Sequence, residues 1–130
     1  MLKKKLGIEC IENRINNCHI SWFYKVPSTL TIPEGCRRIR SGIFGNCNKL
    51  KKVIIPGSVK EIGIEAFWCC RKLEKVVIPE SVVEIGDVAF AGCWDAEIIL
   101  RKPKNEFKYI GDCAFLNCRS VEYAKEETRS

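Results

Sequence analysis

Cysteine is the residue type in this chain whose chemistry first needs an explanation. The sequence holds nine cysteines in 130 residues, together with a single histidine, His19. Thiolates and imidazoles bind zinc, usually through closely spaced pairs such as C-x-x-C. No such pair occurs, because Cys69 and Cys70 are adjacent and Cys113 and Cys118 stand five residues apart. We therefore expect neither a metal site nor a cofactor.

Nucleophilic catalysis by one of these thiols is the second chemistry to consider. It requires a base and an orienting group beside the thiol, and His19 is the one imidazole available. No phosphate-binding loop of the G-x-x-x-x-G-K-[ST] type occurs. The pair Glu61 and Glu65 is typical of a solvated face, with nothing to suit it for acid–base work. We predict no enzymatic activity, although Cys69 could be reactive without being catalytic.

The cysteines make more sense as one letter of an internal repeat. Phenylalanine, cysteine and isoleucine recur together, in steps of 23, 23 and 25 residues. The recurring sets are Phe44, Phe67, Phe90 and Phe115; Cys47, Cys70, Cys93 and Cys118; and Ile39, Ile62, Ile85 and Ile110. A fixed period in this range indicates a solenoid, and a solenoid usually binds rather than catalyses. Four of the cysteines are then explained as small buried groups of the repeat.

Each repeat predicts the same succession of elements. A branched apolar run closed by proline, as in Val76-Val77-Ile78-Pro79, predicts a short strand. A helical turn is expected around each Phe and Cys pair, which stand at i and i+3, and the glycines at 63, 86 and 111 fit a tight corner before it. Stacking the coils at the strand spacing would align the Phe and Ile sets as ladders. A third ladder would hold Leu50, Leu73, Ala96 and Val121.

The recurring letters resemble the theme of the BspA-type leucine-rich repeat, I-P-x-S-V-x-x-I-G-x-x-A-F-x-x-C-x-x-L-x-x-V. The resemblance covers residues 28–124, and the copies beginning at Pro56 and Pro79 match best. It implies an α/β repeat solenoid, a short right-handed coil with a parallel β-sheet on one face and short helical or 3-10 turns on the other. It also implies a role in adhesion or in protein interactions. The fourth copy carries two extra residues, so the strand register of residues 96–105 stays open.

The repeat pattern predicts that the chain is divided into three segments. Residues 1–27 do not match the theme and are expected to form an N-terminal cap, as a β-hairpin, because the ends of a solenoid need a cover. Residues 28–124 hold about four repeats, and residues 125–130 form a polar tail. That tail covers the last coil thinly, and an exposed edge there offers a surface for a homodimer.

Strand alternation predicts which side chains face outward from the sheet. Lys52 and Ile54 point outward in one coil, and Lys75 and Val77 do so in the next. Later coils contribute Ile98 or Ile99, then Glu122 and Tyr123. The predicted partner-binding residues are Lys52, Ile54, Lys75, Val77, Ile99 and Tyr123. An apolar stripe rimmed by charge is typical of a protein-binding face, and the net charge of +6 favours an acidic partner.

Two other functions stay open beside protein binding. Basic residues cluster at recurring positions and could form a ridge for nucleic acid or a ribonucleoprotein. The members of that basic ridge are Arg37, Arg38, Lys49, Arg71 and Lys72. Acidic residues are interspersed among them and weaken any field of a single sign. The second alternative is adhesion at a cell surface, as in exported members of the resembled family.

The start of the chain bears on location. Met1-Leu2-Lys3-Lys4-Lys5 is basic, but Glu9 and Glu12 interrupt the apolar run that a signal peptide needs. No stretch approaches the length of a membrane span. We expect a cytoplasmic protein with reduced thiols, acting as a non-catalytic binding module, such as a small inhibitor or adaptor of a host factor.

Overall fold

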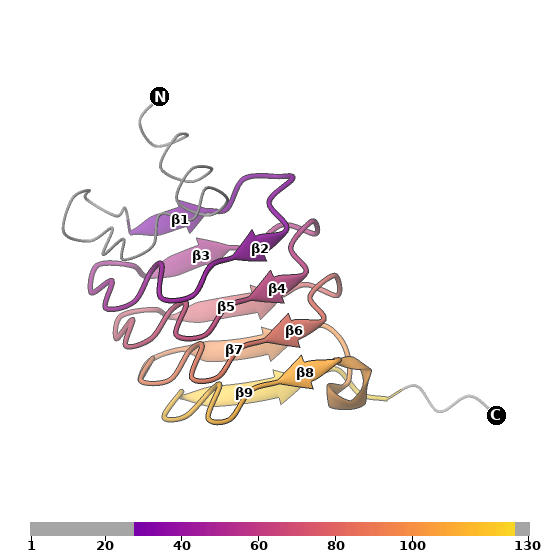
Figure 1. Ribbon diagram of the computed structural model, residues 1–130. Helices are drawn as coiled ribbons and strands as arrows, with labels where there is room; N and C mark the ends of the chain where they lie inside the picture. The colour runs from indigo at the N-terminus through magenta and orange to yellow at the C-terminus, as the bar shows by residue number, and fades with distance from the viewer. Residues whose placement is uncertain (1–27, 127–130) are drawn as a thin grey trace.

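Two parallel β-sheets run along the solenoid, and successive coils add one strand to each sheet (Figure 1). The structure, a computed structural model, describes residues 28–126. The larger sheet contains β1 (Thr29–Thr31), β3 (Lys52–Ile54), β5 (Lys75–Ile78), β7 (Glu97–Leu100) and β9 (Ser120–Tyr123). The smaller sheet contains β2 (Arg38–Ile39), β4 (Glu61–Ile62), β6 (Glu84–Ile85) and β8 (Tyr109–Ile110). The predicted leucine-rich-repeat solenoid is confirmed.

The strands of the larger sheet alternate between the core and the surface. In β5, Val76 and Ile78 are buried while Lys75 is exposed and Val77 is half-buried. Branched residues suit such a half-buried pleated surface. A proline follows the apolar run of each of the first three coils, at positions 33, 56 and 79, and ends the ladder because it has no N–H to donate.

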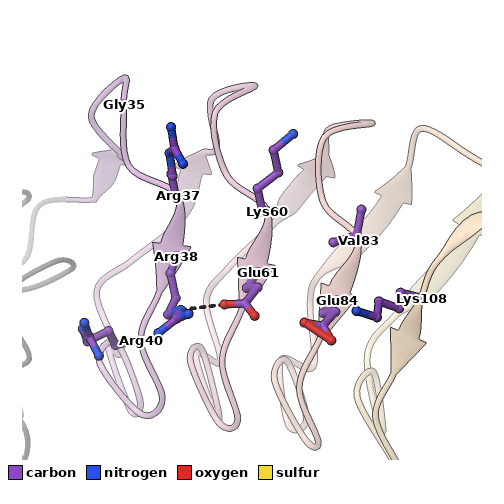
Figure 2. A pocket seen from close by; sticks show the side chains of 9 residues that line it. All are labelled: Gly35, Arg37, Arg38, Arg40, Lys60, Glu61, Val83, Glu84 and Lys108. Carbon is purple, nitrogen blue, oxygen red and sulfur yellow. Dashed lines mark hydrogen bonds and ion pairs between the residues drawn. The ribbon is translucent and has the colours of Figure 1, made fainter.

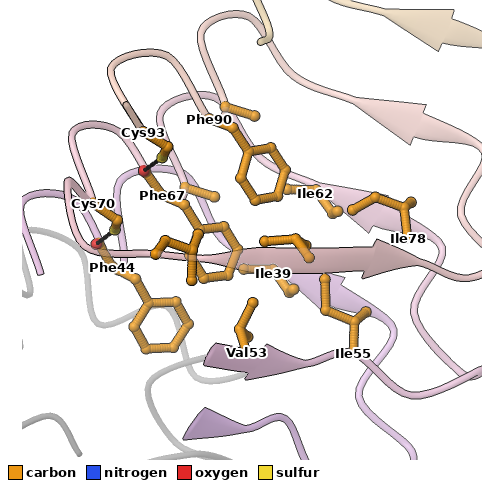
Figure 3. Packing of buried hydrophobic residues seen from close by; sticks show 14 of the residues in the cluster. Ile39, Phe44, Val53, Ile55, Ile62, Phe67, Cys70, Ile78, Phe90 and Cys93 are labelled. Atoms are coloured by element: carbon orange, nitrogen blue, oxygen red, sulfur yellow. Dashed lines mark hydrogen bonds between the residues drawn. The ribbon is translucent and has the colours of Figure 1, made fainter. Parts of the chain in front are cut away.

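The core is built from the ladders that the period predicts (Figure 3). The rings of Phe44, Phe67, Phe90 and Phe115 stack in order, with centroid separations of 5.3, 5.0 and 5.9 Å. The isoleucines of the smaller sheet pair in register, Ile39 with Ile62 and Ile62 with Ile85. One coil alone could not bury these edges, so the coils stabilise one another.

The segments around each phenylalanine are hydrogen-bonded turns rather than the helical turns expected from the sequence. Their backbone N–H groups donate to the next coil: Phe44 N to Ala66 O at 2.9 Å, and Phe67 N to Ala89 O at 2.8 Å. A helix would need the same groups for its own carbonyls. The one helix in the described part of the chain is the 3-10 turn η1 (Lys104–Glu106).

Left-handed backbone conformations shape these turns at two positions in each coil. One set is Gly42, Glu65, Val88 and Cys113, with φ of 69, 58, 49 and 56°. The other is Asn46, Cys69, Gly92 and Asn117, with φ of 61, 58, 81 and 65°. Single residues of this hand interrupt any right-handed helical run, which is why the helical prediction was wrong here.

Glycine recurs after the isoleucine for a different reason from the one expected. The φ angles of Gly63, Gly86 and Gly111 are not positive, so no tight corner requires them. A Cβ atom on Gly86 would lie 2.5 Å from the backbone nitrogen of Ile64 in the preceding coil, and one on Gly63 would lie 2.5 Å from that of Ser41. The glycines therefore allow successive coils to approach closely.

The register left open in the fourth repeat is fixed by the strand pairs. Lys75 pairs with Glu97, one residue short of the 23-residue period, so Ile98 faces the core and Ile99 faces outward. The loop containing η1 then adds residues before β8. Val121 pairs with Ile98, so it belongs to the inward-facing row of the larger sheet. The predicted third ladder therefore ends at Ala96.

The last coil is less covered than the inner ones. Val121 is 39% exposed, whereas its partner Ile98 is fully buried, and Ile110 and Phe115 are only partly buried. The homodimer expected through this edge stays a prediction. The predicted cap over residues 1–27 and the end of the polar tail lie outside the described residues.

Candidate protein-binding face

Two rows of side chains point outward from the larger sheet. Strand pairing defines the first row as Thr29, Lys52, Lys75, Glu97 and Ser120. It defines the second row, one pleat along, as Thr31, Ile54, Val77, Ile99 and Glu122. We call these ten residues the outer face.

The centre of the outer face holds a hollow of about 490 Å³. Ile54 and Val77 lie in it, and Lys52 and Lys75 stand beside them. Ile54 is 44% exposed, although its inward neighbour Val53 is only 4% exposed. An exposed branched side chain within a hollow is a place where a partner can remove apolar area from water.

Two lysines place positive charge at one end of the hollow. Lys52 pairs directly with Lys75, and both are exposed. Like charges opposite each other on adjacent strands repel, so a carboxylate placed between them would relieve that repulsion. Glu80 and Arg101 line the hollow as well, which places charges of both signs elsewhere on its rim.

Besides the inward residues Val53 and Ile55, the hollow is lined by three residues that sequence reasoning missed, Pro79, Glu80 and Arg101. They follow β5 and β7, in the connections to the smaller sheet. Arg101 comes directly after β7, whose register the sequence left open, so its position could not be inferred from the period. The proline at 79 was identified only as a strand end.

Of the six predicted partner-binding residues, five lie on the outer face. Tyr123 does not, because it pairs with the inward residue Leu100. It packs against the core, and its ring meets Phe107 edge-on at 6.2 Å between centroids. Burial raises the pKa of its hydroxyl. Glu122 holds the outward position beside Ile99 instead.

The five residues of the predicted basic ridge are divided between two places. Arg37 and Arg38 stand at the start of β2, in the smaller sheet, whereas Lys49, Arg71 and Lys72 lie in the turns that lead to the larger sheet. Figure 1 shows these two kinds of connection at opposite ends of the strands. Arg38 is also paired with Glu61, Nε to Oε2 at 2.5 Å. The five predicted basic residues therefore do not form one continuous ridge.

The repeat cysteines have a structural role that the sequence did not reveal. All seven cysteines among the described residues are free thiols. Cys70 Sγ donates to the carbonyl oxygen of Phe44 at 3.1 Å, and Cys93 Sγ donates to that of Phe67 at the same distance (Figure 3). Each thiol thus joins its coil to the phenylalanine of the preceding coil. The neighbouring thiols of Cys47 and Cys93, together with burial, hold the pKa of Cys70 well above its ordinary value.

No three side chains of His, Cys, Asp or Glu within residues 28–126 gather closely enough to hold a metal ion. Over the same residues, no helix has the length and apolar character needed to span a membrane.

Comparison with solved structures finds similar solenoids in two larger proteins. A leucine-rich repeat protein from Bacteroides ovatus is 32% identical with a TM-score of 0.62, over 70% of this chain and 23% of that one. A leucine-rich cell surface protein from Faecalibacterium prausnitzii is 23% identical with a TM-score of 0.57, over 80% of this chain and 34% of that one. The chain therefore spans about a quarter to a third of the length of these proteins.

The sequence itself matches a described family over most of its length. No curated protein matches it. The description "BspA type Leucine rich repeat region (6 copies)" matches residues 13–127. That range includes every coil whose ladders are described above. The chain therefore belongs to the BspA-type leucine-rich-repeat family.

Proposed function

We propose that this chain is a non-catalytic binding module that takes a protein partner on its outer face. The observation that carries the proposal is the hollow of about 490 Å³, with Ile54 and Val77 in it and two exposed lysines beside it. Leucine-rich-repeat proteins are commonly protein-binding, and the family supports this class of function.

The chemistry of the hollow defines the partner. An aliphatic or aromatic side chain of the partner would cover Ile54 and Val77, and acidic side chains around it would contact Lys52 and Lys75. Such an arrangement, an apolar anchor with a charged rim, is the usual anatomy of an interface. The partner would therefore present an apolar residue flanked by carboxylates, as an inhibitor's or adaptor's target could.

Binding of a selected ligand tests the proposal. A displayed peptide library would be selected against the protein, and the affinity of the resulting ligand measured by calorimetry. The variant Ile54→Asp plus Val77→Asp should weaken binding by about 100-fold or more, because each change places an unpaired carboxylate in the contact.

A matched control separates this face from general loss of apolar surface. The variant Ile64→Asp plus Leu116→Asp replaces two other exposed apolar residues, at 49% and 51% exposure, in the turns. It should bind the ligand as the parent does. Equal loss in both variants, or a selection that yields no ligand dependent on residues 54 and 77, would contradict the proposal.

Location bears on the adhesion alternative. A cytoplasmic location with reduced thiols stays a prediction. One similar solved structure is named as a cell surface protein, which supports adhesion as the second use of the same face. In either location the outer face would make the contact.

A further inference from the structure

A second groove lies on the other sheet, away from the outer face (Figure 2). Its volume is about 540 Å³. Five of the nine residues that line it are basic and two are acidic; the nine are Gly35, Arg37, Arg38, Arg40, Lys60, Glu61, Val83, Glu84 and Lys108. We call it the basic groove, and none of its residues belongs to the outer face.

The backbone aligns one row of these residues along the solenoid axis. Lys60 N donates to Arg37 O at 2.7 Å, Val83 N to Lys60 O at 2.9 Å, and Lys108 N to Val83 O at 2.8 Å. Arg37, Lys60, Val83 and Lys108 therefore occupy the same position in successive coils. At the strand spacing of about 4.8 Å, the row spans about 14 Å from the first to the last.

The neighbouring row is partly neutralised by its own contacts. It consists of Arg38, Glu61, Glu84 and Tyr109, in register. Burial raises the pKa of Glu61, but the hydrogen bond from Arg38 and the positive charges of Arg38 and Lys108 outweigh it, so the pKa is lowered overall. Figure 2 shows Lys108 extending toward Glu84.

Arg37 and Lys60 are adjacent cations of the groove that are available to a partner. Neither Arg37 nor Lys60 has a salt-bridge partner within residues 28–126, and both are exposed. In Figure 2 their side chains extend to the same side, away from the Arg38–Glu61 pair. Two adjacent cations in a groove attract a negatively charged ligand, so we expect the ligand to be an anion.

We propose that the basic groove binds an acidic peptide segment in extended conformation, running along the solenoid axis. Alternate residues of an extended peptide lie about 6.6 Å apart on one side, within reach of the flexible Arg37 and Lys60 side chains. Carboxylates at i and i+2 of the peptide contact these two cations. The exposed peptide N–H groups face the carboxylates of Glu61 and Glu84, and an apolar side chain lies on Val83.

The carboxylates of Glu61 and Glu84 are the reason why we assign a peptide, rather than a nucleic acid, to this groove. A single strand places phosphates along its whole length, and Glu61 and Glu84 lie beside the cations that it would need. Phosphates brought near those carboxylates are repelled. A peptide instead offers donors on its backbone between its acidic side chains, so it can satisfy both rows.

Fluorescence anisotropy with a labelled peptide in which Glu alternates with Ser tests the proposal. The parent protein should bind this peptide and should not bind its counterpart with Lys in place of Glu. The variant Arg37→Glu plus Lys60→Glu should weaken binding by about tenfold or more. Thermal melting followed by circular dichroism verifies that this variant is folded.

The control variant is Lys49→Glu plus Lys72→Glu. It makes the same change in net charge at equivalent positions of two adjacent coils, but in the turns outside the groove. It should bind the peptide within about twofold of the parent. Equal weakening by both variants would show attraction to net charge alone and would overturn the proposal.

Two other results would also overturn it. One is absence of peptide binding at low salt. The other is tighter binding of an oligothymidine of matched charge, lost on Arg37→Glu plus Lys60→Glu, which would identify a nucleic-acid groove. The outer-face variant Ile54→Asp plus Val77→Asp should leave peptide binding unchanged, so failure here and failure of the proposed function are distinguishable.

Discussion

Substitutions at Cys70 test whether the repeat cysteine acts as a hydrogen-bond donor or only fills space. Cys70 is fully buried, and its Sγ lies 3.1 Å from the carbonyl oxygen of Phe44. No backbone N–H of residues 28–126 donates to that carbonyl. Leaving a buried acceptor unpaired costs about 1–3 kcal/mol, and deleting a buried atom costs about 1 kcal/mol more. The Cys70→Ala variant should therefore lose about 3 kcal/mol of unfolding free energy.

The comparison of Cys70→Thr with Cys70→Val isolates the donor. Threonine and valine have nearly the same shape, so both cause the same crowding, but only threonine carries a hydroxyl that can donate to the Phe44 carbonyl. In an ordinary apolar site the threonine variant is the less stable of the two, because its hydroxyl is buried without a partner. At position 70 we expect the opposite order, with Cys70→Thr more stable by about 1 kcal/mol.

Urea denaturation under reducing conditions, followed by tryptophan fluorescence, measures these differences. Val76→Thr serves as the control, since Val76 is a fully buried, inward-facing residue of β5. This variant should show the ordinary loss of unfolding free energy that follows when threonine replaces a buried valine. If Cys70→Val equals or exceeds Cys70→Thr in stability, the thiol is a space filler and the donor argument is wrong.

Two further substitutions test the backbone of the coils. Gly86→Ala would place a Cβ 2.5 Å from Ile64 N and 2.7 Å from the carbonyl carbon of Gly63, both backbone atoms, and should cost about 3 kcal/mol by urea denaturation because the coils must separate. Val88→Gly should raise the melting temperature, because a branched residue at φ 49° is strained by about 1–2 kcal/mol.

Each of these has a result that would contradict it. Gly86→Ala with parental stability would mean that the coils are not in close contact at this glycine. Val88→Gly without a gain would mean that the strain is smaller than the burial that valine provides, and Val88→Asn, which keeps a side chain tolerant of this conformation, would then show which effect dominates.

The period made the core predictable from one sequence. A residue repeated in every coil must meet its own kind when coils stack, so Phe44, Phe67 and Phe90 could be placed against one another without any structure. The same argument identified Ile54 and Val77 as outward residues, because strand alternation fixes the second face once the first is known.

Backbone hydrogen bonding was not predictable in the same way. The spacing of Phe67 and Cys70 fits a helical turn as well as it fits a tight arc, since both bring i and i+3 together. What decides is the destination of the N–H groups: Phe67 N bonds to Ala89 O in the next coil. That contact depends on the position of a neighbouring coil, which local propensity does not contain.

The fourth repeat shows why the far end of the site was only partly predicted. Its two extra residues are the net result of one residue lost before β7 and additional residues in the loop around η1. The net difference of two residues does not reveal where residues are lost and where they are gained. The sequence therefore left the orientations of Ile98 and Ile99 undecided and wrongly predicted Tyr123 to face outward. The arginine at 101, which lines the hollow, depends on the same register.

The rows that stabilise this solenoid are not the rows to which we assign the proposed recognition. The inward rows tolerate little change, because each side chain touches its equivalents above and below. The outward rows change from coil to coil: the first passes from threonine through two lysines to glutamate and serine. Since outward residues contribute little burial, such changes alter charge at small cost to folding. Under the proposed function, variation along these rows would set partner choice while the core ladders keep the coils in register.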